Sequence, residues 1–390
     1  MKISKKDIED IYTATVKNGN CYTEKAVIFY SKEALDYRLQ LLKNTFPKNT
    51  LHAIAVKTCN QIDVLKHIVN QGFGLEAASI EELILAKSAG AKNEKIVFDS
   101  PVKTKSEINT CHIEFPGVLL NANSLKELER YPKNFNGRIG LRVNPLVQNS
   151  GGAYFNVSTA NSKFGVPISK RKEIIDSCIN HESITCLHFH IGSNLKDLSP
   201  NIEAISKIVE LAIEINSTRL EHGITKKIDT LDIGGGIEFD ANTIVDFVAS
   251  MLKVKNITDF SLITEYGNFI HKYNSFVVSN IEYVTSNGKD LPELAYIHVG
   301  ADLFVRKVYS NLNSDYPYTV LHQSKLNNAH KTKKYTIVGP LCFAGDVLFD
   351  DIELPEIKEG DKFIIQNIGS NTLSMWSGHC SRELPEFIFY

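Results

Sequence analysis

The 390-residue sequence has no apolar run of the roughly 18 residues that a membrane-spanning helix needs, and no long run of one charge sign. Lysine plus arginine number 43 and aspartate plus glutamate 45, which gives a formal net charge of −2. A nearly neutral chain lacks the field that attracts nucleic acid or an anionic membrane. The first residues, MKISKKDIEDIY, also lack the apolar core of a secretory signal. We therefore predict a cytoplasmic protein with no nucleic-acid or membrane partner.

Cysteine spacing excludes two further classes of protein. The seven cysteines form no CxxC pair and no zinc-finger spacing, and an odd number in so long a chain favours reduced thiols over a disulfide framework. We predict no metal site. The length suggests two domains, although a single barrel of about 250 residues can account for most of the chain.

Short apolar runs alternate with segments of helical periodicity through the first two thirds of the chain. Ser79 and Glu82, for example, form a capping-box pattern before one helical segment. Alternation of strand and helix predicts a parallel sheet with crossover helices. The predicted strands are 52–57, 73–78, 96–99, 117–122, 138–143, 185–191, 229–234 and 261–266. Eight such strands indicate a (β/α)8 barrel, which is a TIM-like barrel.

After about residue 270 the pattern changes to strands separated by turns, in FVVSNIEYV, ELAYIHVG, KYTIVG and KFIIQNIG. Few helical crossovers separate these runs, so an antiparallel β domain is predicted for 271–390. The barrel is assigned to 31–270. The run AVIFY at 26–30 precedes the first barrel strand, and we expect the segment 1–30 to join the β domain.

Polar residues follow the carboxyl ends of the predicted barrel strands, where a barrel of this kind has its active site. Lys57 ends the first strand, Arg142 the fifth, and Glu265 the eighth. His188 and His190 end the sixth strand, two residues apart and so on one face. The seventh strand ends in Asp232 and the glycines Gly234, Gly235 and Gly236.

An amine, a glycine-rich turn, a histidine and a buried carboxylate together suit one cofactor. Pyridoxal phosphate carries an aldehyde for the lysine, a phosphate for glycine amides, and an aromatic ring whose nitrogen a carboxylate keeps protonated. Such a ring accepts the electrons released when a bond at Cα of an amino acid breaks.

The chain resembles the fold type III pyridoxal phosphate decarboxylases, which include the diaminopimelate, ornithine, lysine and arginine decarboxylases and share an alanine racemase-like fold. The resemblance covers residues from about 25 to the end and rests on nine segments in order. These are AVKTCN, GLEAASIEEL, IVFDSPVKT, GLRVNP, SKFG, HFHIGS, DIGGGI, EYGN and GPLCFAGD. It implies a decarboxylase whose barrel binds the cofactor, and a homodimer whose active sites each use both subunits.

The resemblance also implies roles for single residues. Lys57 matches the lysine that forms the Schiff base, His190 the histidine stacked on the cofactor ring, and Glu265 the carboxylate at the ring nitrogen. Cys342 matches a cysteine from the partner subunit that protonates the carbanion. The remaining implied cofactor contacts are Arg142, Ser193, Gly234, Gly235, Gly236, Gly267 and Asn371. Asp346 matches an acidic residue that faces the distal end of the substrate.

Three departures from the family pattern affect the expected site. An asparagine, Asn268, stands where the family has the arginine of Glu-Pro-Gly-Arg, and Asn371 stands where it has a phosphate-binding tyrosine. Neither amide restores the bidentate charge of a guanidinium. Phe343 replaces a glutamate that reads a distal ammonium in diaminopimelate decarboxylases, so diaminopimelate is disfavoured as substrate. Arg306 and Tyr309 match that group's substrate-binding pair loosely, with spacing one residue short.

Several alternatives remain open at the level of the sequence. His188 is equally consistent with a core histidine, and Cys342 with a small buried hydrophobe. The expected function is decarboxylation of a diamino acid, or of a modified amino acid in a specialised route such as siderophore synthesis. The rivals are a fold type III racemase, which produces an enantiomer without releasing carbon dioxide, and a non-catalytic relative that binds a protein partner.

Overall fold

The computed structural model describes residues 3–17, 24–149, 155–238, 240–310, 316–322, 325–326 and 332–390. The chain forms two compact units. One consists of Arg38–Phe269, and the other combines Met1–Tyr37 with Ile270–Tyr390. In the described part of the chain, no helix has the length and apolarity that crossing a bilayer requires.

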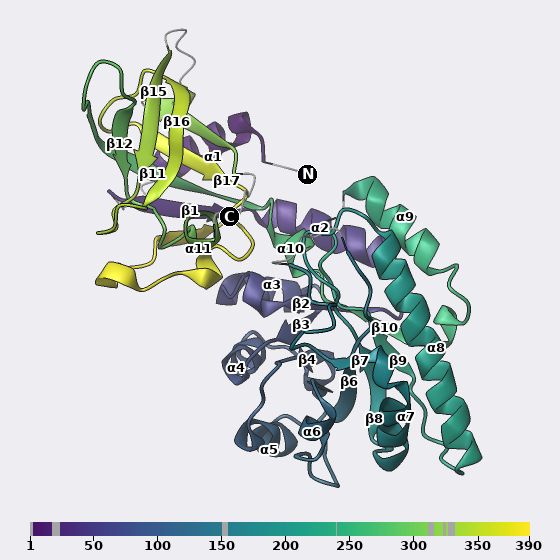
Figure 1. Cartoon of the computed structure of the whole chain (residues 1–390). Coiled ribbons are helices and arrows are strands. Elements are labelled where there is room, and N and C mark those ends of the chain that lie inside the picture. Colours follow the sequence, from purple (N-terminus) through teal and green to yellow (C-terminus); the bar gives the residue numbers. More distant parts are fainter. Residues whose placement is uncertain are drawn as a thin grey trace. The chain divides into compact units, whose positions relative to one another are not determined.

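Eight parallel strands close into a barrel in the unit Arg38–Phe269 (Figure 1). Neighbours pair in the order β5-β4-β3-β2-β10-β9-β8-β6, and β5 pairs with β6 to complete the ring. The strands are β2 (Leu51–Ala55), β3 (Gly74–Ala77), β4 (Ile96–Phe98), β5 (Leu119–Ala122), β6 (Arg138–Asn144), β8 (Ile184–His188), β9 (Thr230–Asp232) and β10 (Ser261–Thr264). A short strand, β7 (Val166–Pro167), pairs with β6. The eight predicted strands and the predicted barrel are confirmed.

Helices connect the barrel strands, as parallel pairing requires. They are α3 (Ile62–Asn70), α4 (Ile80–Ser88), α5 (Lys105–Glu114), α6 (Leu125–Leu128), α7 (Arg171–Asn180), α8 (Ser199–Glu221) and α9 (Ala241–Met251), whereas α2 (Lys32–Thr45) precedes the first barrel strand. Ser79 caps α4 as predicted, since its Oγ accepts a hydrogen bond from the Glu82 amide at 3.2 Å. The Glu82 carboxylate accepts from the Ala78 amide at 2.8 Å, one residue earlier than the capping-box pattern implies.

Side chains from several strands fill the barrel interior in layers. One apolar layer consists of Ala53, Val97, Leu119, Cys186 and Ile263. Residues two positions apart on a strand face the same side. Four of these five residues are followed two positions later by a polar residue, namely Asp99, Asn121, His188 and Glu265. The interior is therefore apolar at this level and becomes polar toward the carboxyl ends of the strands.

The second unit contains one mixed sheet, in the order β14-β13-β17-β11-β12-β15-β16, with β1 pairing to both β11 and β18. Its strands are β1 (Ala26–Tyr30), β11 (Ser275–Thr285), β12 (Glu293–Ile297), β13 (Tyr318–His322), β14 (Lys325–Leu326), β15 (Thr332–Val338), β16 (Val347–Pro355), β17 (Lys362–Gln366) and β18 (Glu386–Phe389). Its helices are α1 (Lys5–Lys17), α10 (Gly267–His271), which begins in the barrel unit, and α11 (Val305–Tyr309). The predicted C-terminal β domain is confirmed.

Two pairs in this sheet are parallel, β12 with β15 and β1 with β18, where an antiparallel domain was predicted. Long connections permit this, because β1 and β18 come from opposite ends of the chain. The run at β1 is apolar throughout because both faces of the strand are covered. Ala26 and Ile28 join one apolar cluster, and Val27 and Phe29 join another.

Candidate active site

Lys57 lies in a single 3-10 turn, Val56–Thr58, directly after β2. Its Nζ is 2.5 Å from Oε2 of Glu76 on β3, and 48% of the lysine side chain is exposed whereas none of the glutamate is. Loss of water lowers the pKa of the Lys57 ammonium, but Glu76, Glu265 and Asp99 raise it, and the net shift is upward. Burial raises the pKa of Glu76 in spite of Lys57. The pair places an amine beside a carboxylate that binds a proton more readily than an exposed one does.

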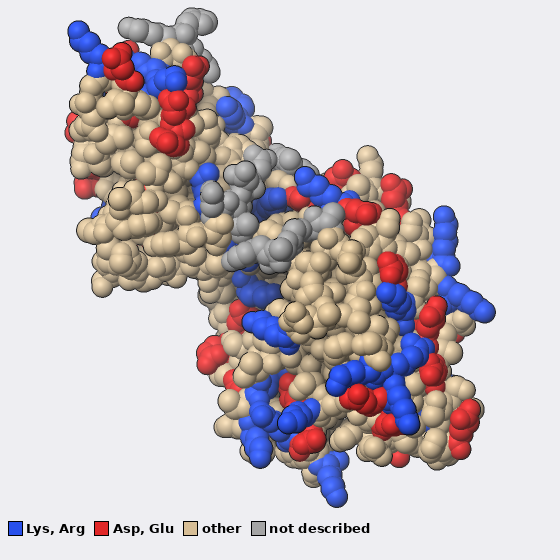
Figure 2. All heavy atoms as spheres, viewed as in Figure 1, with Lys and Arg blue, Asp and Glu red and all other residues tan. Residues whose placement is uncertain are grey.

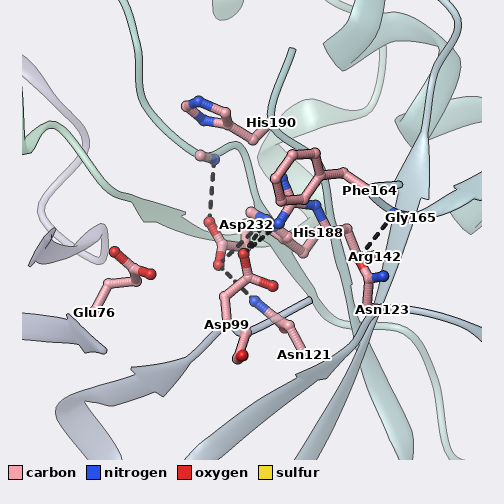
Figure 3. A network of polar contacts seen from close by, with 12 residues as sticks. Glu76, Asp99, Asn121, Asn123, Arg142, Phe164, Gly165, His188, His190 and Asp232 are labelled. Atoms are coloured by element: carbon pink, nitrogen blue, oxygen red, sulfur yellow. Dashed lines mark hydrogen bonds and ion pairs between the residues drawn. The ribbon is translucent and has the colours of Figure 1, made fainter. Parts of the chain in front are cut away.

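A chain of buried charges continues around the barrel from Asp99, which follows β4 (Figure 3). Arg142 on β6 donates from Nη1 to Oδ2 of Asp99 at 2.6 Å. His188, at the end of β8, has Nε2 at 3.4 Å from the same oxygen and Nδ1 at 3.3 Å from Oδ2 of Asp232 on β9. Burial alone would raise the pKa of Asp99, but Arg142 and His188 hold it well below its usual range.

Glu265 follows β10 and is 7% exposed. Its Oε1 has no hydrogen-bond partner among the residues that the structure describes. Burial and the neighbouring Asp232 raise the pKa of Glu265 well above its ordinary value, and His188 opposes them. A buried carboxyl group of this kind is costly unless a cation or a hydrogen-bond donor faces it.

The glycine turn after β9 lies against the turn after β8. Gly234 and Gly236 have φ angles of 62° and 90°, which favour glycine. A Cβ on Gly236 would lie 1.7 Å from the backbone oxygen of Gly192. The Gly235 amide donates to Nδ1 of His190 at 3.2 Å, which orients that ring. Burial and the cations Arg142 and Lys57 lower the pKa of His190 well below its ordinary value, so this imidazole is neutral.

Two further predicted residues lie near these turns. Gly267 has Oγ1 of Thr58 within 2.5 Å of the place where a Cβ would be, so the turn after β10 packs directly on the turn that carries Lys57. Asn268 donates from Nδ2 to Oδ1 of Asn194 at 3.3 Å, beside Ser193. The structure thus brings together the barrel residues that the sequence singled out.

Asp99, His188 and Glu265 have ligand-type atoms within 4.8 Å of one another, a spacing that a metal ion can bridge. Asp99 is already paired with Arg142 at 2.6 Å, and a cation of that kind competes with a metal for the same oxygen. We interpret the three residues as part of a charge network.

The other predicted residues belong to the β-domain unit and mostly gather around α11. Arg306 on α11 donates from Nη2 to Oδ1 of Asn371 at 3.4 Å. Tyr309, at the end of α11, stacks on Phe343 with ring centroids 5.4 Å apart and an interplanar angle of 9°. Cys342, next to Phe343, is exposed.

Asp346 faces the interior of the β domain. It is 3% exposed, and its two carboxylate oxygens accept hydrogen bonds from the amides of Ala301 and Leu341 at 2.6 and 2.7 Å. Gly300 and Gly339 also pack on it. These contacts favour a structural role, in place of the contact with the distal end of a substrate that the sequence suggested.

Sequence reasoning missed Glu76, Asp99 and Asn121. Asn121 on β5 donates from Nδ2 to Oδ2 of Asp232 at 3.2 Å and so joins the network. Each missed residue is a polar side chain near the end of a predicted strand. That is the same sequence feature that identified Lys57 and Glu265, so it could have identified these residues too.

A (β/α)8 barrel with an amine, a neutral imidazole, a glycine turn and a buried carboxylate at one end defines a barrel protein built for pyridoxal phosphate. Residues 32–271 match the pyridoxal binding domain of pyridoxal-dependent decarboxylases, and residues 174–369 match the C-terminal sheet domain of the same enzymes. The chain belongs to the pyridoxal-dependent decarboxylase family, and pyridoxal phosphate is its cofactor.

Relatives and solved structures agree with this assignment. The chain is 27% identical over 381 residues to diaminopimelate decarboxylase of Archaeoglobus fulgidus, which covers 92% of this chain and 86% of the relative. It is 28% identical over 373 residues to the Haemophilus influenzae enzyme of the same name, covering 90% and 85%.

Solved structures show the same fold. Diaminopimelate decarboxylase from Helicobacter pylori complexed with L-lysine matches with a TM-score of 0.84 at 23% identity, over 97% of this chain and 94% of that one. Lysine/ornithine decarboxylase from Vibrio vulnificus complexed with cadaverine matches with a TM-score of 0.81 at 20% identity, over 100% and 99%.

The residues present fit pyridoxal phosphate. Oε1 of Glu265 is a buried acceptor in need of a donor, which a protonated ring nitrogen supplies. Lys57 provides an amine for the aldehyde, and the glycine turn leaves no room for side chains where backbone must approach a phosphate.

Replacing Gly236 by alanine should weaken cofactor binding, because the new Cβ would collide with the Gly192 oxygen at 1.7 Å and displace the turn. We expect affinity for pyridoxal phosphate to fall at least about tenfold, or roughly 1.4 kcal/mol. Titration followed by the visible absorbance of the bound cofactor measures this. Gly223→Ala is a matched control, since Gly223 also has a positive φ of 76° but has nothing within 4 Å of its Cβ position. Equal losses in both variants would contradict the prediction.

Proposed function

We propose that this protein removes the α-carboxylate of a diamino acid as carbon dioxide and returns a proton to Cα. The observation that carries the proposal is the pairing of Lys57 with Glu76 at the carboxyl end of the barrel, the end that also holds Glu265, whose buried Oε1 has no hydrogen-bond partner among the described residues. Pyridoxal phosphate, when bound, supplies an aldehyde that reacts with amines and a ring that withdraws electrons from Cα.

Each barrel residue then has a defined task. Lys57 is the amine that binds the cofactor, and Glu76 takes the proton that its Nζ must lose before it is nucleophilic. Glu265 would hold the proton on the ring nitrogen, and His190, a neutral imidazole oriented by the Gly235 amide, would contact the ring. Arg142 fixes Asp99 and so shapes the charge around the ring.

The phosphate is assigned to the turns that pack on one another. Gly234, Gly235, Gly236, Gly267 and Ser193 would bind it. The asparagines at 268 and 371 stand where the family has an arginine and a tyrosine, and we propose that they contribute amide hydrogen bonds in their place. This replaces a charged contact by neutral ones.

Loss of Lys57 should abolish both the cofactor band and catalysis. We expect Lys57→Ala to lose the visible band of the covalently bound cofactor and to release carbon dioxide at least about a thousandfold more slowly. Absorbance spectra and carbon dioxide assays measure the two effects. Lys95→Ala is the control, because Lys95 lies before β4 at the opposite end of the barrel and donates to the Gly72 carbonyl at 2.7 Å. A wild-type protein with no band after addition of pyridoxal phosphate would sink the proposal.

Two observations bear on the substrate. The named relatives are diaminopimelate decarboxylases, although Phe343 removes an acidic contact to a distal ammonium. The carboxylate of Asp346 is bound by backbone amides, so it is less suited to bind a substrate ammonium. Arg306 on α11, beside Asn371, is instead a cationic side chain. A guanidinium pairs with a carboxylate. We therefore propose a diamino acid with a second carboxylate, of which diaminopimelate is the first to test.

The comparisons give no support to the three alternatives raised by the sequence. A siderophore-type route, a racemase and a non-catalytic partner-binding protein have no counterpart among the relatives named above. The expectation that Phe343 disfavours diaminopimelate also runs against the names of these relatives.

Arg306→Ala should discriminate between substrates. We expect KM for diaminopimelate to rise roughly tenfold or more, because a charged hydrogen bond to the distal carboxylate is lost. KM for lysine, which lacks that carboxylate, should change little. Steady-state kinetics on diaminopimelate, lysine, ornithine and arginine measures this. Lys307→Ala on the same helix is the control, since its ammonium lies over the Phe349 ring at 4.6 Å. Equal losses on diaminopimelate and lysine would refute the assignment.

We further propose a homodimer with shared active sites, in which Cys342 of one subunit holds the proton that Cα receives in the other. The exposed position of Cys342 on the β domain supports this. Lys57→Ala and Cys342→Ala should each be inactive alone and regain carbon dioxide release when mixed, because one of the two sites in the mixed dimer has both residues. No recovery in mixtures that sedimentation shows to have exchanged subunits would exclude shared sites.

A further inference from the structure

His188, at the end of β8, lies between the carboxylates of Asp99 and Asp232 (Figure 3). Its side chain is fully buried, with Nε2 at 3.4 Å from Asp99 and Nδ1 at 3.3 Å from Asp232. A neutral imidazole has one N–H and one lone pair. Neither contact has hydrogen-bond geometry among the described residues, so the attraction is that of an ion pair. A neutral ring would turn a lone pair toward one carboxylate, whereas an imidazolium carries a positive charge that attracts both.

The alternative, a neutral His188 beside a protonated aspartic acid, is opposed by the other contacts of the two aspartates. Asp99 accepts from the Arg142 guanidinium at 2.6 Å. Asp232 accepts from Nδ2 of Asn121 at 3.2 Å and from the amide of Gly234 at 3.1 Å. Donors of this kind stabilise the ionised carboxylate. The proton therefore belongs on the histidine.

The charge balance of the layer depends on this proton. Four carboxylates, Glu76, Asp99, Asp232 and Glu265, share the barrel end with the cations Lys57 and Arg142. A charged His188 leaves one carboxylate in excess, and among the described residues Glu265 is the one of the four that is in no ion pair, since Glu76 pairs with Lys57, Asp99 with Arg142 and His188, and Asp232 with His188. A neutral His188 would leave two, and buried excess charge is relieved by protonation.

We propose that His188 is an imidazolium throughout the working range of the protein and a positioning residue that, through Asp99, Asp232 and Glu265, keeps Glu265 ionised toward the cofactor's ring nitrogen. The part that concerns the ring nitrogen rests on the proposed function. The charge of His188 can affect Glu265 through space, because ligand-type atoms of His188, Glu265 and Asp99 lie within 4.8 Å of one another. Burial lowers the pKa of His188, but Asp232, Asp99 and Glu265 raise it well above its ordinary value.

The charge of His188 is measurable without catalysis. In protein labelled with ¹⁵N-histidine, the His188 signal, assigned by its absence in His188→Gln, should show two protonated ring nitrogens from about pH 6 to 8, above and below the ordinary histidine pKa. Spectra with and without pyridoxal phosphate keep this result separate from the proposed function. A neutral ring within that range would overturn the proposal. If the variant does not fold, the His188 signal can be assigned by its protection from solvent. The ring protons of exposed histidines exchange with water and their signals broaden, whereas the signal of the buried His188 stays sharp.

The positioning role is measurable in the cofactor spectrum. Removing a buried cation raises the pKa of every neighbouring group. In His188→Gln we therefore expect the pH midpoint of the cofactor absorbance to move upward by about one unit or more. His52→Gln is the matched control. His52 is also buried and bonds through Nδ1 to Thr264 at 2.8 Å, and burial lowers its pKa to about 4, so its replacement removes no charge.

Three results decide the matter. A shift in His188→Gln alone supports the proposal. An unmoved midpoint in His188→Gln, or equal shifts in both variants, overturns it, because a merely structural histidine would reduce the band without moving its midpoint. A wild-type protein without any band overturns the proposed function and the link to the ring nitrogen, while the histidine spectra still decide the charge of His188.

Discussion

The structure depends on a layer of charged side chains at the carboxyl end of the barrel, in which every member except the half-exposed Lys57 is buried. Lys57, Arg142 and His188 lie 2.5 to 3.4 Å from three carboxylates, those of Glu76, Asp99 and Asp232. A fourth carboxylate, that of Glu265, has a ligand-type atom within 4.8 Å of those of Asp99 and His188. Buried charges are tolerated only when they are paired and hydrogen-bonded. Asp99 and Asp232 are each held by side chains from other strands, so a shift of β6 or β8 would break an ion pair of the layer. Oε1 of Glu265 is a buried oxygen without a hydrogen-bond partner among the described residues, and a cationic ring nitrogen would supply the donor it needs.

The scaffold below this layer explains how the charges are held. Apolar side chains fill the barrel interior, and the residue two positions later on the same strand faces the same interior at a higher level. Small residues give the polar side chains room. Gly140 is an example, because a Cβ there would lie 2.1 Å from Oδ1 of Asn121. The mixed charges on the outer surface shown in Figure 2 have no comparable constraint, since water screens them.

The β domain follows a different logic. Two apolar clusters cover the two faces of its central strands β1, β11 and β17, and most of its polar candidates lie on and around α11. Asp346, in the motif GPLCFAGD, matches an acidic residue of the family, and its carboxylate accepts hydrogen bonds from two backbone amides. The same motif leaves Cys342 exposed. A shared segment therefore fixes which residue is present, and the local turn decides where it points.

The sequence by itself determined the eight barrel strands, the β domain after residue 270, and the polar residues that end several strands, Lys57 and Glu265 among them. These follow from hydrophobic periods of two and 3.6 residues, which are local properties. Only the tertiary structure paired Lys57 with Glu76, placed His188 between Asp99 and Asp232, and turned Asp346 inward. The two aspartates are far apart in the chain and meet because the sheet closes on itself. Periodicity identifies the face of each strand, but barrel closure decides which faces meet.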